Sequence, residues 1–358
     1  MPSLKEIKGR INSISSTLAI TSAMKMVAAA KLQKAQMAIQ NMLPYERRLY
    51  SMLVDLMGAM NISAAASEDG SVRGSGSAER GFAQSGDRLS LSNRHDLAGM
   101  DGAYSLMAQR EVRKVAIVAF ASNSSLCGAF NSNVIREATA VINEYRASGL
   151  RDSDIVVYSV GRKMAEAMRK LGFPSPADFT KMSDSPSYEA ASALAQELLD
   201  GFVSGRFDKV ELVYNHYKST SSQPTTRQTY LPLSLADATA DLQAGKIADS
   251  ASESDTNRGA ETVGAPVVRQ GSPTTEDLIV EPSKEALIAI LLPKVIRLRI
   301  FTTLLDSAAA EHAARTVAMQ LATDNGNDLL QELTLEYNKG RQQKITSEIL
   351  DLVGGSMQ

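Results

Sequence analysis

The residue types that could act as nucleophiles or metal ligands are few in this chain. Its 358 residues include one cysteine, Cys127, and three histidines, His95, His216 and His312. Cys127 lies in the segment LCGAF, between an apolar run and a helical pattern, where α/β folds place ligands and nucleophiles. A phosphatase-type loop would have arginine six residues later, but that residue is Asn133. A buried structural thiol is therefore favoured over a catalytic cysteine.

Phosphate-binding motifs are absent from the turns of the sequence. The segment SNSSLCGAFN contains no GxGxxG pattern, and no GxxxxGK[ST] occurs anywhere. Gly161-Arg162-Lys163 could hold a phosphate at a helix N-terminus, although an ordinary turn with solvated charges is the favoured interpretation. One cysteine excludes an intramolecular disulfide and a cysteine-rich zinc site. We expect neither a cofactor nor a metal.

The composition points to long helices and against several classes of function. Hydrophobic residues make up 44% of the chain, aromatic residues only 5%, and tryptophan is missing. The formal net charge of −2 argues against a globally basic nucleic-acid-binding protein. The strongest apolar run, Ala286–Leu292, is too short to span a bilayer, and we do not expect the opening residues to form a secretory signal. Any membrane association is expected to depend on a partner.

The middle of the chain has the alternating pattern of an open α/β sheet. The continuous apolar run VAIVAFA at 115–121 is typical of a buried parallel strand. Alternation of strands with helices favours a Rossmann-like domain. Further strands are expected at 155–160 and 210–217, followed by an extended segment at 227–231, and helices are expected at 131–148, 162–171 and 187–202.

Both ends of the chain predict very long helices with coiled-coil spacing. The first, from about Ser3 to Met60, is expected to kink at Pro44. The second follows Glu281 and extends to about Val353, with Pro293 separating a short first helix. In the first helix, core positions in steps of three and four residues fall at Leu4, Ile7, Ile11, Ile14, Leu18, Thr21, Lys25, Ala28, Leu32, Ala35, Ile39 and Met42. In the second they fall at Leu298, Phe301, Leu305, Ala308, His312, Arg315, Met319, Ala322, Gly326, Leu329 and Leu333.

The C-terminal pattern ends near Gly340, and an apolar stripe returns in a new register at Ile345, Ile349 and Leu352. This stripe must be packed by something other than the first helix. The two helices most simply pair antiparallel. We therefore expect an α/β protein with a long antiparallel coiled coil of N- and C-terminal helices and a Rossmann-like middle domain. The expected divisions are a helix at 1–60, a low-complexity insertion at 61–110, the α/β domain at 111–235, a second insertion at 236–278, and a helix at 279–358.

Polar residues at two core positions of the first helix have three interpretations. Thr21 and Lys25 could set the register of the coiled coil, as buried polar residues often do. Alternatively, this stretch faces another protein, because the set Lys25, Lys31 and Lys34 with Met24 and Met26 would suit an acidic, adaptable partner surface. A solvated basic face is a third interpretation that periodicity alone leaves open.

The two termini together resemble one family. SLKEIKGRINSISSTLAITSAMKMVAAAKLQKAQ is similar to the N-terminal signature of the γ subunits of F-type ATP synthases. AAAEHAARTVAMQLATDNGNDLLQELTLEYNKGRQQKITSEILDLVGG resembles their C-terminal helix. SLCGAFN, VELVYNHYKS and the EPS before the last helix also fit. The resemblance covers roughly three quarters of the chain, whereas the low-complexity segments exceed a minimal γ subunit.

The resemblance implies a central rotor shaft that couples proton flow through the membrane sector to ATP synthesis or hydrolysis on the β subunits. It implies α and β subunits, the ε subunit and the c-subunit ring as partners, with catalysis on β. It also implies a peripheral position on the cytoplasmic side of a bacterial inner membrane. By analogy, β contacts would come from Met24, Lys25, Met26, Arg341 and Gln342, an apolar bearing from Ile345, Ile349, Leu352 and Val353, and a foot toward the c ring and ε from Glu281.

Two other functions remain as alternatives. The chain could be an α/β enzyme or nucleotide-binding protein dimerised through its coiled coil, in which case changes at Cys127 or Arg162 would perturb activity. It could instead be a stalk of the related vacuolar-type rotor, although that interpretation has no place for the Rossmann-like middle. The missing phosphate motifs argue against the enzyme.

Overall fold

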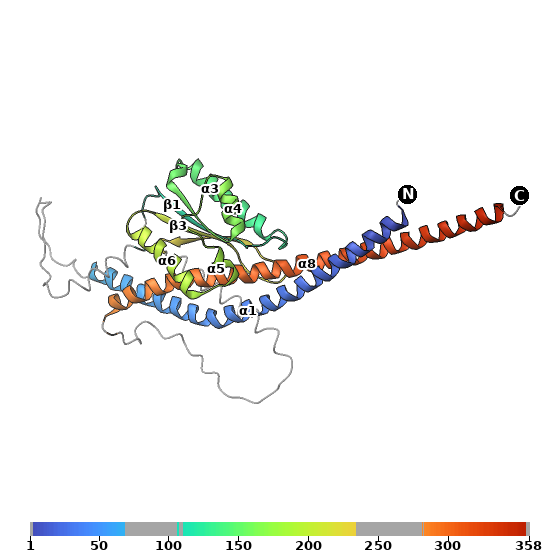
Figure 1. Cartoon of the computed structure of the whole chain (residues 1–358). Helices are drawn as coiled ribbons and strands as arrows, with labels where there is room; N and C mark the ends of the chain where they lie inside the picture. The colour runs from blue at the N-terminus through green and yellow to red at the C-terminus, as the bar shows by residue number, and fades with distance from the viewer. Residues whose placement is uncertain (1–2, 69–105, 107–109, 234–280, 282, 356–358) are drawn as a thin grey trace, which may run out of the picture.

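Two long antiparallel helices dominate the computed structural model, which describes residues 3–68, 106, 110–233, 281 and 283–355. Helix α1 is Leu4–Glu68 and helix α8 is Lys284–Gly355. At 1.5 Å per residue, each is about 100 Å long. Figure 1 shows that they wind around each other, with both chain termini at the same end and α8 extending beyond the start of α1. The predicted antiparallel coiled coil is confirmed.

Both helices contain a proline that does not interrupt them. Helix α1 passes through Pro44 and ends at Glu68 rather than near Met60. Helix α8 is continuous through Pro293, so the prediction of a separate short first helix is wrong. A proline inside a helix costs about 3 kcal/mol. Here the residues around Pro293 pack into the core, and burial of Leu292 and Val295 stabilises the uninterrupted helix.

The α/β domain lies against the half of the coiled coil farther from the termini (Figure 1). Its described elements follow the predicted alternation, with the addition of a short helix, α5, that the sequence pattern did not indicate. In chain order they are β1 (Val115–Phe120), α3 (Phe130–Ala147), the 3-10 turn η2 (Asp152–Asp154), β2 (Ile155–Val160), α4 (Arg162–Lys170), α5 (Thr180–Asp184), α6 (Tyr188–Val203), β3 (Lys209–Asn215) and β4 (Thr225–Leu231).

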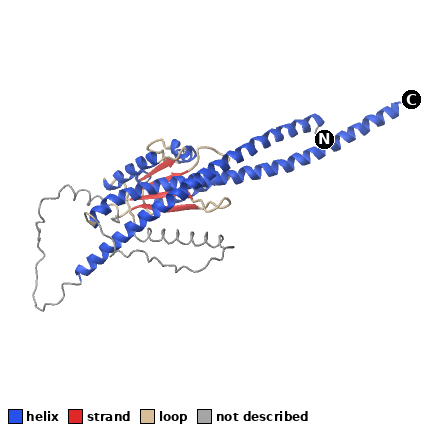
Figure 2. Cartoon of the chain, turned by 90° about the horizontal axis from the view of Figure 1, so that it is seen from below, coloured by secondary structure: helices blue, strands red, loops and turns tan. Residues whose placement is uncertain are grey.

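The sheet has the strand order β2-β1-β3-β4, with the first three strands parallel and β4 antiparallel to β3. Because side chains alternate along a strand, β1 serves both faces. Val115, Ile117 and Ala119 pack with α3 and α4. Ala116, Val118 and Phe120 join the core formed with α6 and the two long helices. The coiled coil therefore forms one of the layers that cover the sheet, as Figure 2 also shows from below.

The two segments predicted as low-complexity insertions lie largely outside the described residues. Residues 61–68 belong to α1. Leu106 is buried in the core, and its carbonyl accepts a hydrogen bond from the Leu233 amide at 3.1 Å. The chain is therefore anchored to the domain core shortly before β1 begins.

Candidate functional site: the coiled coil and its junction with the α/β domain

The predicted core positions of α1 all lie against the protein interior or are half-buried. In α8 the prediction holds at every position, Gly326 and Leu333 included, except two, where the inward-facing residue shifts by one. Thr323 and Leu330 replace Ala322 and Leu329, which are exposed. Two successive four-residue steps, Arg315 to Met319 and Met319 to Thr323, produce this shift. Such an interruption of the three-four alternation changes the local winding of a coiled coil.

Two glycines of α8 allow the helices to approach closely near the termini. A Cβ atom added to Gly326 would lie 2.7 Å from Cδ2 of Leu18, and one added to Gly340 would lie 3.1 Å from Cδ2 of Leu4. Leu4 is the first residue of α1. The helix pair therefore ends at Gly340, where the sequence pattern predicted its end.

The polar core positions of α1 pair with α8 inside the chain. Lys25 Nζ donates a hydrogen bond to Gln320 Oε1 at 2.6 Å, and the hydroxyl groups of Thr323 and Thr21 lie 3.2 Å apart. Gln320 in turn donates to the carboxylate of Asp324 at 2.8 and 2.9 Å. These contacts favour the register-setting interpretation of Thr21 and Lys25.

The three residues of the Met24–Met26 motif face different surroundings. Met24 and Lys25 are half-buried. Met26 is 67% exposed. The structure therefore does not present these three side chains as one outward surface.

The C-terminal tail, residues 341–355, extends past the end of the helix pair. Arg341 and Gln342 are exposed. The predicted apolar stripe is also exposed: Leu352 is 74% exposed, and the other members are Ile345, Ile349 and Val353. Glu281 is exposed just before α8 begins, at the opposite end of that helix.

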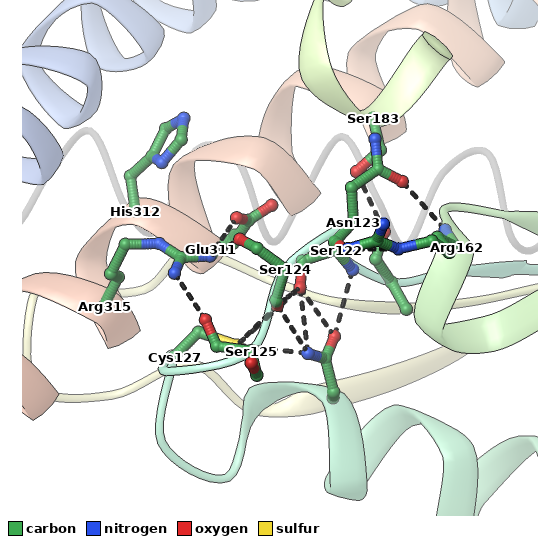
Figure 3. Close-up of polar contacts among 12 residues, drawn as sticks. Ser122, Asn123, Ser124, Ser125, Cys127, Arg162, Ser183, Glu311, His312 and Arg315 are labelled. Atoms are coloured by element: carbon green, nitrogen blue, oxygen red, sulfur yellow. Dashed lines mark hydrogen bonds and ion pairs between the residues drawn. The ribbon is translucent and has the colours of Figure 1, made fainter. Parts of the chain in front are cut away.

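At the carboxyl edge of the sheet, where open α/β sheets bind ligands, α8 occupies the surface. Arg315 Nη1 donates to the Ser125 carbonyl at 2.7 Å, and its Nη2 donates to Ser124 Oγ at 2.8 Å and to Glu311 Oε1 at 2.6 Å. Figure 3 shows these bonds joining α8 to the loop after β1. Burial raises the pKa of Glu311, and Arg315 offsets this only in part.

His312 adjoins this ion pair on α8 but carries no charge at neutral pH. Burial lowers its pKa to about 4, with further contributions from the cations Lys31 and Arg315. Its Nδ1 atom has no hydrogen-bond partner among the described residues. His312 thus behaves as a half-buried neutral side chain of the coiled coil.

Cys127 and Arg162, the two residues considered for chemistry at this edge, both form hydrogen bonds within the chain. Cys127 is buried, and its Sγ atom accepts a hydrogen bond from Asn131 Nδ2 at 3.2 Å. The Arg162 guanidinium donates to the Asn123 carbonyl at 3.0 and 2.7 Å, and its backbone amide donates to Asn123 Oδ1 at 2.8 Å (Figure 3). The Lys163 amide donates to the Ser122 carbonyl. Asn123 and Ser122 of the same chain therefore accept hydrogen bonds from the amides of the first turn of α4 that a phosphate would need. This disfavours the phosphate-site interpretation.

A second junction, which sequence reasoning missed, joins the turn between β3 and β4 to both long helices. We call Gln36, His216, Tyr217 and Asp306 the Asp306 cluster. The Asp306 carboxylate lies 2.6 Å from His216 Nδ1 and accepts the Tyr217 amide at 2.9 Å. Gln36 Nε2 donates to the Tyr217 hydroxyl at 2.6 Å. The sequence signal was weak, because Asp306 merely stands between core positions of α8.

The residues that the structure describes lack two further features. No helix among them is long and apolar enough to cross a membrane. Within the same residues, His, Cys, Asp and Glu side chains do not gather in threes that could hold a metal ion.

Comparison with known proteins agrees with this architecture. A family model described as ATP synthase matches residues 3–357. The ATP synthase gamma chain of Phocaeicola vulgatus is 46% identical over 357 residues, with 100% of both chains covered. The gamma chain of Bacteroides thetaiotaomicron is 45% identical over 358 residues, also with 100% of both covered. That of Flavobacterium johnsoniae is 35% identical, with 99% of this chain and 98% of the relative covered.

Two solved structures share the fold at low sequence identity. A chain of the Euglena gracilis mitochondrial ATP synthase rotor is 18% identical, with a TM-score of 0.51 and coverage of 96% of this chain and 98% of that chain. A chain from the OSCP/F1/c-ring part of the same enzyme is 18% identical, with a TM-score of 0.54 and coverage of 99% and 93%. With the full-length sequence matches, these findings lead to one conclusion: the chain belongs to the ATP synthase gamma chain family.

Proposed function

We propose that this chain is the central rotor shaft of an F-type ATP synthase, which couples proton flow through the membrane sector to ATP synthesis or hydrolysis on the β subunits. The observation that carries the proposal is the long helix pair whose tail continues past Gly340 with exposed Ile345, Ile349 and Leu352. Exposed apolar side chains along an unpaired helix suit an enclosing partner. The names of the full-length relatives agree with this role.

The mechanism we propose uses the asymmetry of the shaft. A hexamer of alternating α and β subunits would surround the helix pair, so each β subunit would meet a different face of it. A shaft that binds the alternative conformations of β unequally shifts their populations. Rotation would then move each catalytic site through the same states in turn, while the α/β domain and the adjacent ends of α1 and α8 contact the ε subunit and the c-subunit ring.

The residues that we assign to these contacts are the ones that the resemblance indicated. Met26, Arg341 and Gln342 project from the helix pair or its tail and are available to β. Met24 and Lys25 are half-buried, so their contribution to β would be through the parts left exposed. Ile345, Ile349, Leu352 and Val353 would fill the bearing at the end of the hexamer. Glu281 would lie toward the c ring or ε.

We further propose that the chain is non-catalytic and that chemistry takes place on β. The enzyme alternative depended on Cys127 and Arg162, but Cys127 is buried and Arg162 is held by Asn123. The edge of the sheet that would hold a ligand is covered by Glu311 and Arg315 of α8. No observation on the described residues favours the enzyme or the vacuolar-type stalk over the rotor.

For location, we propose a peripheral position on the cytoplasmic side of a bacterial inner membrane, with attachment through the c-subunit ring and ε. The relatives at 44–46% identity come from Phocaeicola and Bacteroides. The apolar tail and exposed Glu281 lie at opposite ends of α8. The proposed contacts with the hexamer and with the c ring or ε are therefore far apart, which agrees with attachment to the membrane through partners.

The test is an affinity purification from detergent-solubilised membranes of the source organism. The tag is inserted near Gly76, because both termini are expected to be enclosed by the hexamer. We expect α, β, ε and c subunits to co-purify with ATPase activity. Recovery of the chain alone, or with unrelated proteins, would contradict the rotor function. A parallel purification with an untagged chain controls for nonspecific retention.

A further inference from the structure

The turn between β3 and β4 is fastened to the helix pair by polar and apolar contacts together. Tyr217 packs against two small buried clusters. One consists of Leu32, Ala309 and Ala313, and the other of Cys127, Phe130 and Ala310. The Tyr217 hydroxyl accepts a hydrogen bond from Gln36 of α1, and its amide donates to Asp306 of α8. One residue of the α/β domain thus contacts both long helices.

Each oxygen of the Asp306 carboxylate contacts a different group, a backbone amide in one case and a histidine ring in the other. Oδ1 accepts the Tyr217 amide, which does not titrate, whereas Oδ2 lies 2.6 Å from the His216 ring. The Asp306 side chain is only 17% exposed, while that of His216 is about half exposed. A proton can therefore reach His216 from solvent and change the charge that faces a mostly buried carboxylate.

The base of the turn is held independently of this pair. The His216 amide donates to the Pro224 carbonyl at 2.9 Å, and Ser219 and Ser222 exchange backbone hydrogen bonds at its tip. Asn215 Nδ2 donates to the Phe130 carbonyl at 3.1 Å. These contacts keep the turn folded whichever protonation state His216 adopts, so titration would act on its attachment to α8.

We propose that the Asp306 cluster is a pH-sensitive latch that fastens the α/β domain to both helices of the coiled coil, closed while His216 is protonated and weakened when it is neutral. A charge-assisted hydrogen bond to a carboxylate is stronger than a neutral one. The proposal concerns the chain itself and does not depend on the rotor function. Within the rotor, it would make the attachment of the α/β domain to the shaft firmer at lower pH.

The direction of the effect follows from the charges around His216. The hydrogen bond to Asp306 raises the pKa of His216, opposed by burial and by Lys218 of the same turn. Asp306 comes from α8, and Gln36, which contacts the turn from α1, is uncharged. Because the pKa is raised above its ordinary value of 6.5, the contribution is complete below about pH 6.5 and is lost as pH rises through the folded pKa.

The experiment uses the full-length chain and two variants, His216→Gln, which keeps a donor but cannot titrate, and Asp306→Asn. The pKa of His216 is measured by NMR of histidine-labelled protein. Hydrogen exchange of the peptide containing the Tyr217 amide is followed from pH 6 to 8.5 and corrected for intrinsic rates. We expect protection of this amide to fall about fivefold over that range in the wild type and to stay constant in His216→Gln. The pKa of His216 should drop in Asp306→Asn.

Exchange in α4, which is outside the cluster, provides the internal control and should match in all three proteins. Equal pH profiles for the wild type and His216→Gln would overturn the proposal. An unchanged His216 pKa in Asp306→Asn would also overturn it. Neither measurement uses partner subunits, so its failure is distinguishable from failure of the affinity purification.

Discussion

At the residue scale, Glu211 of β3 is a buried carboxylate whose hydrogen bonds hold neighbouring elements of the α/β domain together. Its side chain is 2% exposed, and it accepts hydrogen bonds from Tyr145 at 2.7 Å, Lys209 at 2.6 Å and Arg227 at 2.7 Å. These donors come from α3, β3 and β4. Burial alone would raise the pKa of Glu211, but the hydrogen bonds outweigh it and hold the pKa below its ordinary value.

We predict that Glu211→Gln lowers the free energy of unfolding by about 2–4 kcal/mol, because it leaves two cations around a neutral buried group. Urea denaturation of the full chain near pH 7 measures this. The matched control is Glu144→Gln, which removes the exposed partner of Arg227 and should cost less than about 1 kcal/mol. A similar loss in both variants would contradict the assigned importance of burial.

The same residue has a predictable pH dependence. Since the folded pKa of Glu211 is lowered, its contribution is present above its unfolded value near 4.5 and is lost as pH falls through the folded pKa. The stability difference between the wild type and Glu211→Gln should therefore be constant above pH 5 and shrink below about pH 4. Denaturation curves at several pH values check this, and a difference that grows on acidification would exclude the explanation.

Residue-scale features of this kind could be predicted from the sequence only in part. The burial of Cys127 was predicted because the sequence lacks the arginine that a phosphatase-type loop needs at position 133, where Asn133 stands. The partners of Glu211 could not be predicted, because Tyr145 and Arg227 are 66 and 16 residues away and only the folded sheet brings them together. The Asp306 cluster was missed for the same reason, since local periodicity carries no information on contacts between α8 and a distant turn.

At the element scale, hydrophobic spacing predicted the coiled coil but not all of its details. Core positions were right where large apolar residues repeat, as at Ile7 and Leu32. They were wrong at Ala322 and Leu329, because contacts with the partner helix place the adjacent residues Thr323 and Leu330 inward instead. Pro293 was given too much weight, since tertiary packing overrode its local preference.

Two glycine substitutions test the close helix contact. Gly326→Leu should destabilise the chain by about 1–2 kcal/mol net, because crowding against Leu18 exceeds the gain in helix propensity. Gly9→Ala, at a site with nothing within 4 Å of the added Cβ, should stabilise it by about 0.5–1 kcal/mol. Thermal unfolding of the two variants decides the matter: if both stabilise the chain, the contact at Gly326 is wrongly assigned.

At the scale of the whole molecule, the structure changes which residue best tests coupling. Lys25→Glu would place a carboxylate beside Gln320 and near Asp324, so it would disturb the shaft as well as any contact with β. Arg341 is exposed beyond the helix pair. We predict that Arg341→Glu leaves thermal unfolding of the chain unchanged and lowers ATP-driven proton pumping in membranes with normal assembly. Wild-type pumping would argue against a β contact at Arg341.

The exposed tail gives the most direct prediction for assembly. Its apolar side chains are exposed in the isolated chain and therefore add nothing to its folding. They would contribute free energy only when a partner buries them. Leu352→Ser should leave the unfolding temperature of the chain unchanged and weaken its retention by α and β about tenfold, equivalent to about 1.4 kcal/mol of lost burial. Leu171→Ser is the matched control, because Leu171 is 45% exposed at the end of α4, away from the shaft. Retention is measured by salt-washing the purified complex. Equal losses for the two variants would mean that the tail has no enclosing partner, since hydrophobic exposure alone would then explain both.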